Sequence, residues 1–461
     1  MVQKQMHVCI KYKSLLVLVW FILYYCYFDT LSAQPTKRLY ETPQELTQKT
    51  QKSFIALWEE GLFLQTPGEE IKLRVNGLLQ FDAFVLIPSD QLETVFGSTH
   101  SNVLNRRFQL AISGPLSTFW NFKVQFELAR QDVRFLDMFV QRHSLPYVGT
   151  LTFGKFTVPF GLEELISSRF TTFQERSLLA AFAPGSEIGL KLDNTFLNRR
   201  MSWAFSASSR AQDETSFDVA GEPGDLSFAW RLTGLPWLHE SRQRLFHLGL
   251  AYNLRRPADG KIRYRTRPEV FSDDLRFVDT GQLDVHIVHQ FGIEVALVHG
   301  PWSIQSEAMV ALIQSDNTAA DNTHYVGVYI LTSYFLTGEY RPYNPSTAAF
   351  GRPPVPSSVL RGGWGTWELA VRLSYLDLDD AFGIGTITTD AGRQTGGGKE
   401  LNLTLGVNWY AHSHIRVTLN YVLALVDRHI IETNDAGLRI RDANFTPEPA
   451  NIVMLRLQAD F

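Results

Sequence analysis

The last nine residues, 453–461, constrain the fold more than any other stretch of the chain. Every odd position is apolar, with Val453, Leu455, Leu457, Ala459 and Phe461, and the even positions 456, 458 and 460 hold the strongly polar Arg456, Gln458 and Asp460. A period of two places successive side chains on opposite faces of a β-strand, so one face meets an apolar medium and the other a polar one. A strand buried on both faces in a sandwich core would not carry such a polar face. The pattern is typical of a strand in the wall of a membrane β-barrel.

The same alternation recurs along the chain from residue 71 onward. Sixteen segments show it: 71–86, 105–113, 121–128, 133–143, 150–157, 187–194, 201–210, 225–232, 244–254, 282–298, 302–313, 323–336, 364–376, 400–409, 415–426 and 451–461. Most are close to the roughly 9–11 residues that a tilted membrane strand requires. The sequence therefore predicts an all-β fold, a transmembrane antiparallel barrel of about 16 strands. A soluble all-β protein is the alternative, but it would not need a signal peptide, an even strand count and a terminal aromatic residue together.

The connections between these segments alternate in length. Short ones lie at 114–118, 145–149, 196–200, 300–301 and 411–414, and long ones at 90–104, 158–186, 211–224, 255–281, 378–399 and 427–450. Short turns on one side and long extracellular loops on the other are the arrangement of outer-membrane barrels, and we expect some loops to fold into the lumen. Segment 337–363 breaks the rule, because it is long and proline-rich but belongs to the short-turn side. Either a strand is divided wrongly there, or a long periplasmic turn folds into the lumen.

Three regions are expected: a signal peptide at 1–33, a periplasmic N-terminal extension at 34–70 and the transmembrane β-barrel at 71–461. The apolar run 14–28 follows three lysines and precedes small residues at 31–33, as in a secretory signal peptide. An uncleaved N-terminal anchor is the alternative. Within the extension, Leu46, Phe54, Leu57 and Trp58 have near-helical spacing, which predicts a short helix within 43–64. A leader that packs on nothing is the other interpretation.

Composition excludes several function classes. Both cysteines, Cys9 and Cys26, lie in the predicted signal peptide, so the mature chain would have no disulfide, reactive thiol or cysteine-bound metal. Formal net charge is −4, and removal of residues 1–33 leaves 40 basic against 46 acidic residues. A net-negative chain argues against nucleic-acid binding. No catalytic motif is present, and the histidines are not spaced for a shared metal, so we expect neither an enzyme nor a cofactor or metal site.

The segment 152–185 holds the third long loop and the first candidate site residues. Its apolar residues suit packing against a barrel wall, and a loop folded into the lumen would set the narrowest point of a pore. Its basic residues are therefore candidates for binding anions or lining the pore: Lys155, Arg169 and Arg176. The alternative interpretation is an apolar plug that only stiffens the barrel.

The segment 255–267 is the most basic part of the chain. It holds Arg255, Arg256, Lys261, Arg263, Arg265 and Arg267, with Asp259 as its one acidic residue. In an extended conformation the last four cations fall on one face, roughly 6.5–7 Å apart. Such a row can pass an anion from site to site, because conduction needs several moderate sites and not one deep site. The alternative is a surface row that binds lipopolysaccharide phosphates or solvates the loop.

Several stretches resemble the phosphate-selective porins of the O and P type. They are F-G-K-F, P-F-G-L-E-E-L and F-Q-E-R within 153–176, R-P-E-V-F at 267–271, F-V-D-T-G at 277–281, G-P-W-S-I-Q-S-E at 300–307, Y-F-L-T-G-E-Y-R-P-Y at 334–343, G-T-W-E-L-A-V-R-L-S at 365–374, G-V-N-W-Y at 406–410 and the final L-R-L-Q-A-D-F. The resemblance implies a sixteen-stranded outer-membrane barrel, usually a homotrimer, with inward-folded loops and an arginine-rich passage for anions. It associates anions with basic residues of those loops, which here match Lys155, Arg169, Arg176 and 261–267.

Two hypotheses follow. In the first, the protein is a bacterial outer-membrane channel for passive diffusion of small anions, phosphate above all, through an arginine- and lysine-lined pore. In the second, it is a general-diffusion porin or a structural outer-membrane protein whose basic loop binds lipopolysaccharide. A barrel phospholipase is a distant third, since no Ser–His pair is credibly placed.

Overall fold

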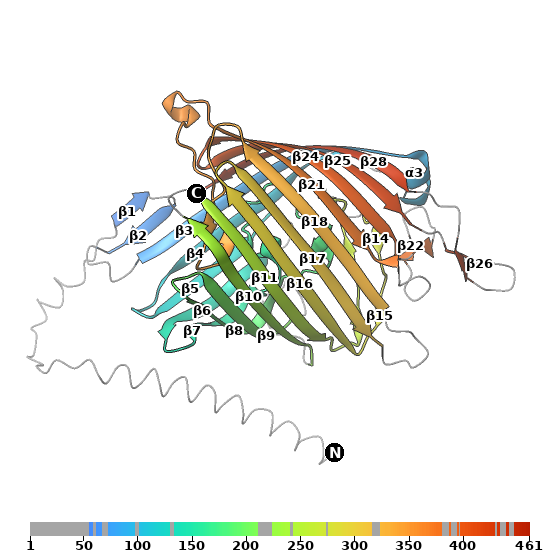
Figure 1. Cartoon of the computed structure of the whole chain (residues 1–461), viewed down its shortest axis with the longest axis horizontal. Coiled ribbons are helices and arrows are strands. Elements are labelled where there is room, and N and C mark those ends of the chain that lie inside the picture. The colour runs from blue at the N-terminus through green and yellow to red at the C-terminus, as the bar shows by residue number, and fades with distance from the viewer. Residues whose placement is uncertain are drawn as a thin grey trace, which may run out of the picture. The chain divides into compact units, whose positions relative to one another are not determined.

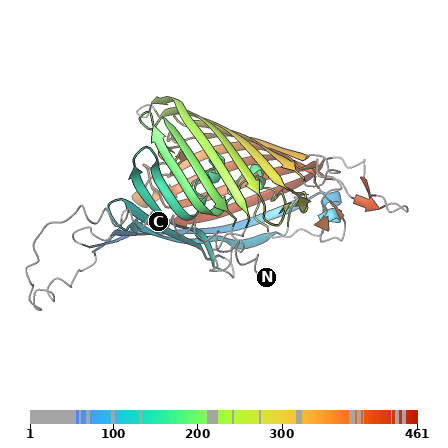
Figure 2. The same ribbon diagram turned by 90° about the horizontal axis from the view of Figure 1, so that it is seen from below.

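A computed structural model describes residues 55–58, 61–66, 72–96, 101–129, 133–210, 224–239, 243–272, 275–315, 323–379, 387–388, 394–395, 397–428, 431–433, 439–441 and 447–461. Sixteen strands of one sheet pair antiparallel with their neighbours, and β28 pairs with β3 to close the ring (Figure 1). The predicted sixteen-stranded antiparallel barrel is therefore confirmed. Figure 2 shows the strands inclined across the wall in the turned view.

Each barrel strand overlaps one of the sixteen predicted segments. The strands are β3 (Lys72–Pro88), β4 (Asn102–Pro115), β5 (Trp120–Glu127), β6 (Arg134–Leu145), β7 (Gly149–Thr157), β8 (Ser186–Phe196), β9 (Met201–Ser209), β10 (Leu226–His239), β11 (Arg244–Arg256), β16 (Ile287–His299), β17 (Trp302–Gln314), β18 (Thr323–Phe335), β21 (Thr366–Asp377), β24 (Lys399–His412), β25 (Ile415–Asp427) and β28 (Glu448–Asp460). Within the described part of the chain, no helix is long and apolar enough to span a membrane.

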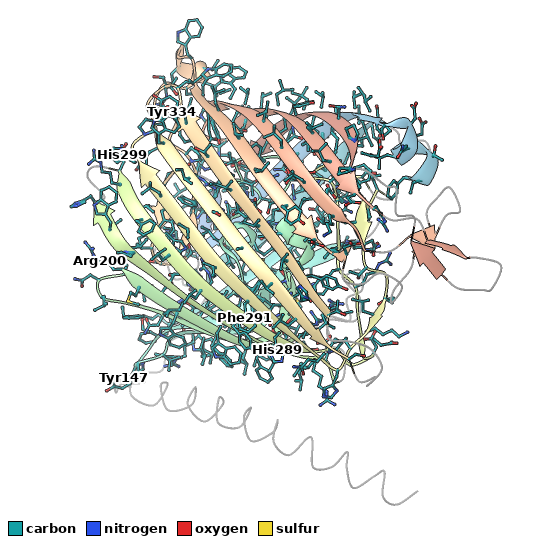
Figure 3. The ribbon with its side chains drawn as sticks, turned by 45° about the vertical axis from the view of Figure 1, so that its right-hand side comes forward. Tyr147, Arg200, His289, Phe291, His299 and Tyr334 are labelled. Atoms are coloured by element: carbon teal, nitrogen blue, oxygen red, sulfur yellow. The ribbon has the colours of Figure 1, made fainter. Side chains whose placement is uncertain are left out.

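The two faces of the wall differ as the alternation predicts. In β28, Arg456, Gln458 and Asp460 are buried inside the barrel, whereas Leu455 and Leu457 are 42% and 52% exposed on the outside. Aromatic residues gather on the outer face near both strand ends, where Figure 3 labels Tyr334 at one end and Phe291 at the other. Such girdles mark the two headgroup levels of the membrane.

The helix predicted within 43–64 is wrong for the residues that the structure describes. β1 (Ile55–Trp58) and β2 (Leu62–Gln65) form an antiparallel hairpin, and β2 pairs with 72–75 of β3. β28 pairs with β3 only from Leu78 onward, so the hairpin occupies the part of the β3 edge that β28 leaves open. The Trp58 ring lies 5.6 Å from the Phe461 ring. Residues 1–54 lie outside the described part, so the signal peptide remains a prediction.

Short elements lie in the connections. They are α3 (Asp90–Phe96), α4 (Leu162–Leu165), η1 (Leu178–Ala181), β12 (Lys261–Ile262), β13 (Arg265–Thr266), β14 (Val278–Asp279), β15 (Leu283–Asp284), β19 (Tyr343–Asn344), β20 (Ala349–Phe350), η3 (Val359–Arg361), β22 (Ile387–Thr388), β23 (Gln394–Thr395), β26 (Ile431–Thr433) and β27 (Arg439–Arg441). β18 pairs directly with β21, so the strand boundaries on either side of 337–363 were placed correctly. This segment is a long turn at the end of the barrel where the other described turns are short.

Candidate pore and its basic lining

The loop between β7 and β8, residues 158–185, crosses the barrel interior. Its main chain is fastened to inward-facing side chains of the wall from β16 to β28. Glu307 of β17 accepts the backbone N–H groups of Leu162 and Glu163, each at 2.7 Å. Carbonyls of the same loop accept amide N–H groups from Gln290, Asn408 and Gln458. The predicted inward folding of this loop is therefore confirmed.

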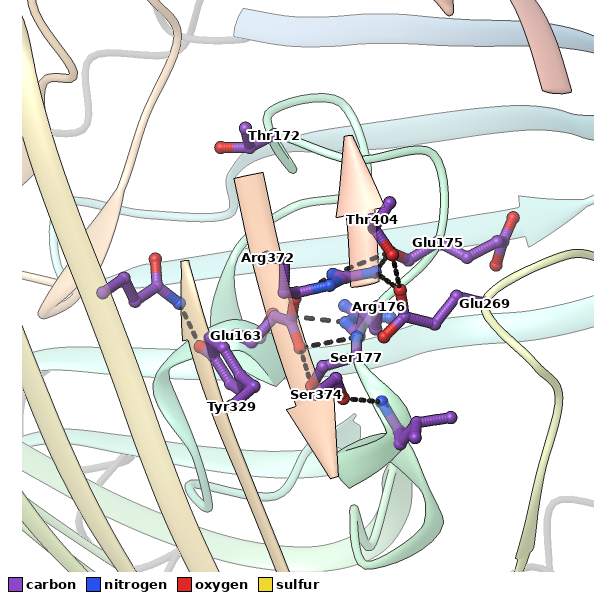
Figure 4. A network of polar contacts seen from close by, with 12 residues as sticks. Glu163, Thr172, Glu175, Arg176, Ser177, Glu269, Tyr329, Arg372, Ser374 and Thr404 are labelled. Carbon is purple, nitrogen blue, oxygen red and sulfur yellow. Dashed lines mark hydrogen bonds and ion pairs between the residues drawn. The ribbon is translucent and has the colours of Figure 1, made fainter. Parts of the chain in front are cut away.

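Arg372 of β21 is the centre of the contacts between this loop and the wall (Figure 4). Its guanidinium pairs with Glu163 at 3.1 Å and with Glu269 at 2.6 Å, and it also donates to the Glu175 carbonyl. Glu163 in turn accepts from the backbone and hydroxyl of Ser177. Arg372 is 1% exposed, so its charge is balanced by carboxylates and does not reach the solvent.

Arg456 of β28 makes a second contact of this kind. It forms a bidentate pair with Asp82 of β3 at 2.6 Å, and it pairs with Glu175 of the loop at 2.8 Å. Two carboxylates therefore surround one fully buried guanidinium. Because charge-assisted bidentate bonds are strong and directional, the pair fixes the loop beside the β28–β3 seam.

The long turn also folds into the interior, from the short-turn side. Tyr343 bonds to His247 at 2.8 Å, and the Ala348 carbonyl accepts from Arg231 at 3.0 Å. Ala349 and Phe350 pack against Leu162 and Ile166 of the loop. We call the interior beside β10, β11, β16–β18, β21, β24, β25 and β28, where the loop and the turn pack, the filled half.

The opposite side of the interior, beside β4–β7, is hollow. One cavity of about 450 Å³ lies between these strands and residues 164–168 of the loop. A second, of about 340 Å³, lies between the loop and residues 265–276. Both cavities are lined by Arg106, Arg107, Glu164 and Arg176, so they adjoin. We call the two together the basic passage.

Basic residues outnumber acidic ones in the lining of the basic passage. The nine basic residues are Arg106, Arg107, Lys123, Arg134, Lys155, Arg176, Arg265, Arg267 and Arg276, and the five acidic ones are Glu127, Asp137, Glu164, Glu175 and Glu269. This excess contrasts with the net-negative charge of the whole chain. Low-dielectric walls focus the field of lining charges, so an excess of basic side chains makes the potential inside such a hollow more positive.

The loop carboxylates of the basic passage differ in how firmly they hold their charge. Burial would raise the pKa of Glu175, but Arg106 and Arg107 outweigh it and hold that pKa well below its usual range. The Arg106–Glu175 pair is bidentate, at 2.7 and 2.8 Å. For Glu164, burial raises the pKa and the partner Arg176, at 3.2 Å, only partly opposes it. Glu164 is therefore the carboxylate of this pair that protonates first as pH falls.

Four of the predicted site residues lie in the lining. Lys155 lines the larger cavity, Arg176 lines both, and Arg265 and Arg267 line the smaller one. Arg176 also donates to the carbonyls of Glu163, Glu164 and Ile166, so it shapes the loop as well as the lining. The Arg267 guanidinium lies 4.3 Å from the Phe271 ring, and Arg106 lies 3.9 Å from the same ring.

The other five predicted residues lie elsewhere. Arg255 is buried between Glu187 at 3.1 Å and Asp225 at 2.9 Å, and Arg263 pairs with Asp279 at 2.6 Å. Arg256 follows the inward Arg255 and is exposed on the outer face of β11. Lys261 is exposed opposite Asp284, and Arg169 lies outside the lining of both cavities. The alternation of exposed and buried residues at 261–267 matches the expected row, but two short strands, β12 and β13, divide it.

Sequence reasoning missed five basic lining residues: Arg106, Arg107, Lys123, Arg134 and Arg276. Two of them, Arg107 and Lys123, lie on the polar faces of predicted strands. This placement alone could have identified them as residues that face the lumen. Their partners were not visible from sequence, because Arg107 bonds to Gln80 and Lys123 to Asp137 on neighbouring strands. Among the described residues, no group of three or more His, Asp or Glu side chains is arranged to hold a metal ion.

The family model of phosphate-selective porin O and P matches residues 91–461. The chain belongs to this family. Membership places this porin in the bacterial outer membrane and makes it a channel.

Three similar proteins illustrate the match. Porin O of Pseudomonas aeruginosa is 25% identical over 396 residues, covering 80% of this chain and 86% of that protein. An uncharacterized protein of Caulobacter vibrioides is 28% identical over 325 residues, 69% of this chain but only 62% of that relative. Among solved structures, an anion-selective porin from Comamonas acidovorans gives a TM-score of 0.48 at 9% identity, over 85% of this chain and 100% of that chain.

Proposed function

We propose that this outer-membrane channel conducts small anions, phosphate above all, by passive diffusion through the basic passage. The observation that carries the proposal is the lining of the basic passage, which holds nine basic residues and five acidic ones. The family description, phosphate-selective porin, supports phosphate as the ligand. No catalysis and no cofactor enter this proposal, and we further propose that the porin is a homotrimer, as its family resemblance implies.

The chemistry of the lining suits a phosphate that moves. Guanidinium groups match phosphate oxygens with paired N–H donors and stay charged at all physiological pH values. Several of the lining cations already have a carboxylate partner, as Arg106 has Glu175 and Lys123 has Asp137. Each such cation attracts an anion less than an unpartnered one would. A series of moderate sites lets an anion enter and also leave, which conduction requires.

The test is single-channel recording in planar bilayers, with phosphate added to a chloride solution. We expect phosphate to reduce the chloride current of the wild type. In the double variant Arg107→Gln and Arg265→Gln, the concentration needed should rise about tenfold or more, because each lost charged hydrogen bond costs about 1.5–3 kcal/mol. Arg256→Gln is the matched control on the outer face of the barrel, and it should behave as the wild type does. A chloride current that phosphate leaves unchanged would refute the proposal.

Arg256 also supports the second candidate function, lipopolysaccharide binding by the basic segment. It is exposed on the outer face at the long-loop end of β11, within reach of lipid phosphates, and Lys261 is exposed nearby in the chain. If lipopolysaccharide binding is the function, Arg256→Gln together with Lys261→Gln should lower the retention of lipopolysaccharide by the purified porin. The phosphate effect on current would then be absent from wild type and variant alike.

A further inference from the structure

The turn between β18 and β21 has a second part that stays outside the barrel. Residues 356–365, which we call the outer knob, contain the short helix η3 and project beyond the strand ends at the upper left of Figure 1. Leu360 is 72% exposed and Trp364 is 84% exposed. With Val359, which is 39% exposed, they gather large apolar side chains at the tip of one turn, and exposed apolar side chains that cluster mark a surface for lipid, protein or ligand.

The outer knob is a built structure that holds these side chains outward. The Gly365 N–H donates to the Ser357 carbonyl at 2.8 Å, and the Gly363 N–H donates to the Ser358 carbonyl at 3.0 Å. Gly362 has a φ of 80°, in the left-handed region that favours glycine. A Cβ at Gly363 would lie 2.2 Å from the Ser357 carbonyl oxygen, so glycine is required there as well. The exposure of Leu360 and Trp364 therefore belongs to a defined conformation.

The outer knob is fastened to the aromatic girdle of the short-turn end. The rings of Trp367 and Trp409 stack at 5.7 Å on the outer face of β21 and β24. Both indole N–H groups donate to the Trp364 carbonyl, at 3.2 and 3.0 Å. The girdle continues through Trp302 and Tyr334, whose rings are 4.6 Å apart. Since tryptophan and tyrosine girdles lie at the headgroup level, the knob is held at that level.

We propose that the outer knob is a membrane anchor whose tip, Leu360 and Trp364, inserts into the headgroup region of the periplasmic leaflet. This inference rests on the outer-membrane location and not on the conducted anion. Trp suits the boundary between headgroups and acyl chains, and Leu suits the apolar side of it. Arg361, exposed between them in the chain, carries the charge that a lipid phosphate would meet.

The shape and position of the knob favour lipid over a neighbouring copy of the chain. Its large exposed apolar side chains are Val359, Leu360 and Trp364. A stable interface between proteins buries roughly 800 Å² on each partner, which so small a convex tip does not supply. The knob is instead continuous, through Trp367 and Trp409, with the lipid-facing surface of the strands, where Leu369 and Leu405 are 41% and 43% exposed.

Spin labelling tests the proposal. Leu360→Cys and, separately, Trp364→Cys are labelled with a nitroxide, and the porin is placed in vesicles of phosphatidylethanolamine and phosphatidylglycerol. Collision rates are measured with oxygen, which concentrates in lipid, and with a water-soluble nickel chelate. We expect the ratio of oxygen collisions to nickel collisions at both positions to be clearly higher than at a site exposed to water. The control is Gln91→Cys, exposed on the polar face of α3 in a long loop, where nickel should dominate.

Two outcomes would overturn the proposal. If the ratio of oxygen to nickel collisions at residues 360 and 364 is as low as at residue 91, the knob lies in water. If both reagents are excluded and the spectra broaden through spin–spin coupling, a second copy of the chain covers the tip. Wild-type protein carried through the same labelling measures any background from Cys9 and Cys26, which lie in the predicted signal peptide.

Discussion

Arginine is prominent both in the filled half of the barrel interior and in the basic passage, but its surroundings differ between the two regions. In the filled half, Arg231, Arg372 and Arg456 each pair with a carboxylate and are at most 5% exposed. In the basic passage, arginines also meet carboxylates, but cations are in excess and the lining surrounds a hollow. We infer that the role of an arginine inside the barrel, in stability or in attracting an anion, depends on its partners and its access to water. Its position on an inward strand face does not decide this.

The largest effect expected is on the filled half. Arg372→Met removes the partner of Glu163 and Glu269 and leaves both carboxylates buried without it. Breaking a buried pair in this way costs about 3–5 kcal/mol of unfolding free energy. Urea unfolding of the porin in detergent should show that loss, and Arg265→Met, in the exposed part of the passage, serves as the control. A free energy of unfolding equal to that of the wild type would show that Arg372 does not hold the loop.

A change of charge in the basic passage is expected to alter the conduction of ions and not the stability of the fold. Arg265 is exposed in β13, so Arg265→Glu should leave the free energy of unfolding within about 0.5 kcal/mol of the wild type. It replaces a positive charge of the lining by a negative one, and we expect the preference for chloride over potassium to fall markedly in reversal-potential measurements. An unchanged reversal potential would place Arg265 outside the conduction path and weaken the contrast between the two regions.

A smaller effect is expected from pH, through Glu164. Its raised pKa means that it takes up a proton at a higher pH than an ordinary glutamate does, and the passage then loses one negative charge. Anion preference should therefore rise as pH falls through the acid range. Glu164→Gln should show the higher preference already at neutral pH and lose this part of the pH dependence. Glu175, whose pKa is held low, should stay charged over the same range. A pH profile of Glu164→Gln identical to that of the wild type would contradict this assignment.

The smallest effect is expected at the seam where β28 of the filled half meets β3. Trp58→Ala removes the ring that packs on Phe461 at the end of the closed sheet. An aromatic pair contributes about 0.5–1.5 kcal/mol beyond its buried area, so the loss should be small but measurable in urea unfolding. Leu57→Ala, on the opposite face of the hairpin, is the comparison variant. If both variants lose the same free energy of unfolding, the contact between Trp58 and Phe461 adds no specific stability to the closed barrel.

The fold followed from the sequence because its signal is local. Each strand carries its own alternation, and the medium on either side of the wall is the same for all of them, so segments such as 400–409 could be identified without knowing their neighbours. The β1–β2 hairpin shows the limit. Leu57 and Trp58 have helical spacing with Phe54, but they form a strand that pairs with β2, and β2 in turn pairs with the edge of β3 that β28 leaves open. The open edge depends on where β28 ends its pairing with β3, and β28 lies almost 400 positions further along the chain than β1.

The site could be predicted only in part, for the same reason. Arg176 and Arg265 were found as basic residues of inward loops, and they do line the hollow. Arg255 looked the same in sequence, yet it is neutralised by Glu187 and Asp225, which come from another strand and another loop. Whether a cation is balanced depends on carboxylates that only the closed barrel brings beside it. Local sequence carries no record of that pairing.

Anion preference of the basic passage is tested most directly by the reversal potential of the wild-type channel across a gradient of potassium chloride. The excess of basic side chains in the passage predicts a potential of the sign that chloride preference gives, and a smaller chloride preference in the double variant Arg107→Gln and Arg265→Gln. A wild-type potential of zero, or one of the sign that potassium preference gives, would show that the basic passage does not select anions.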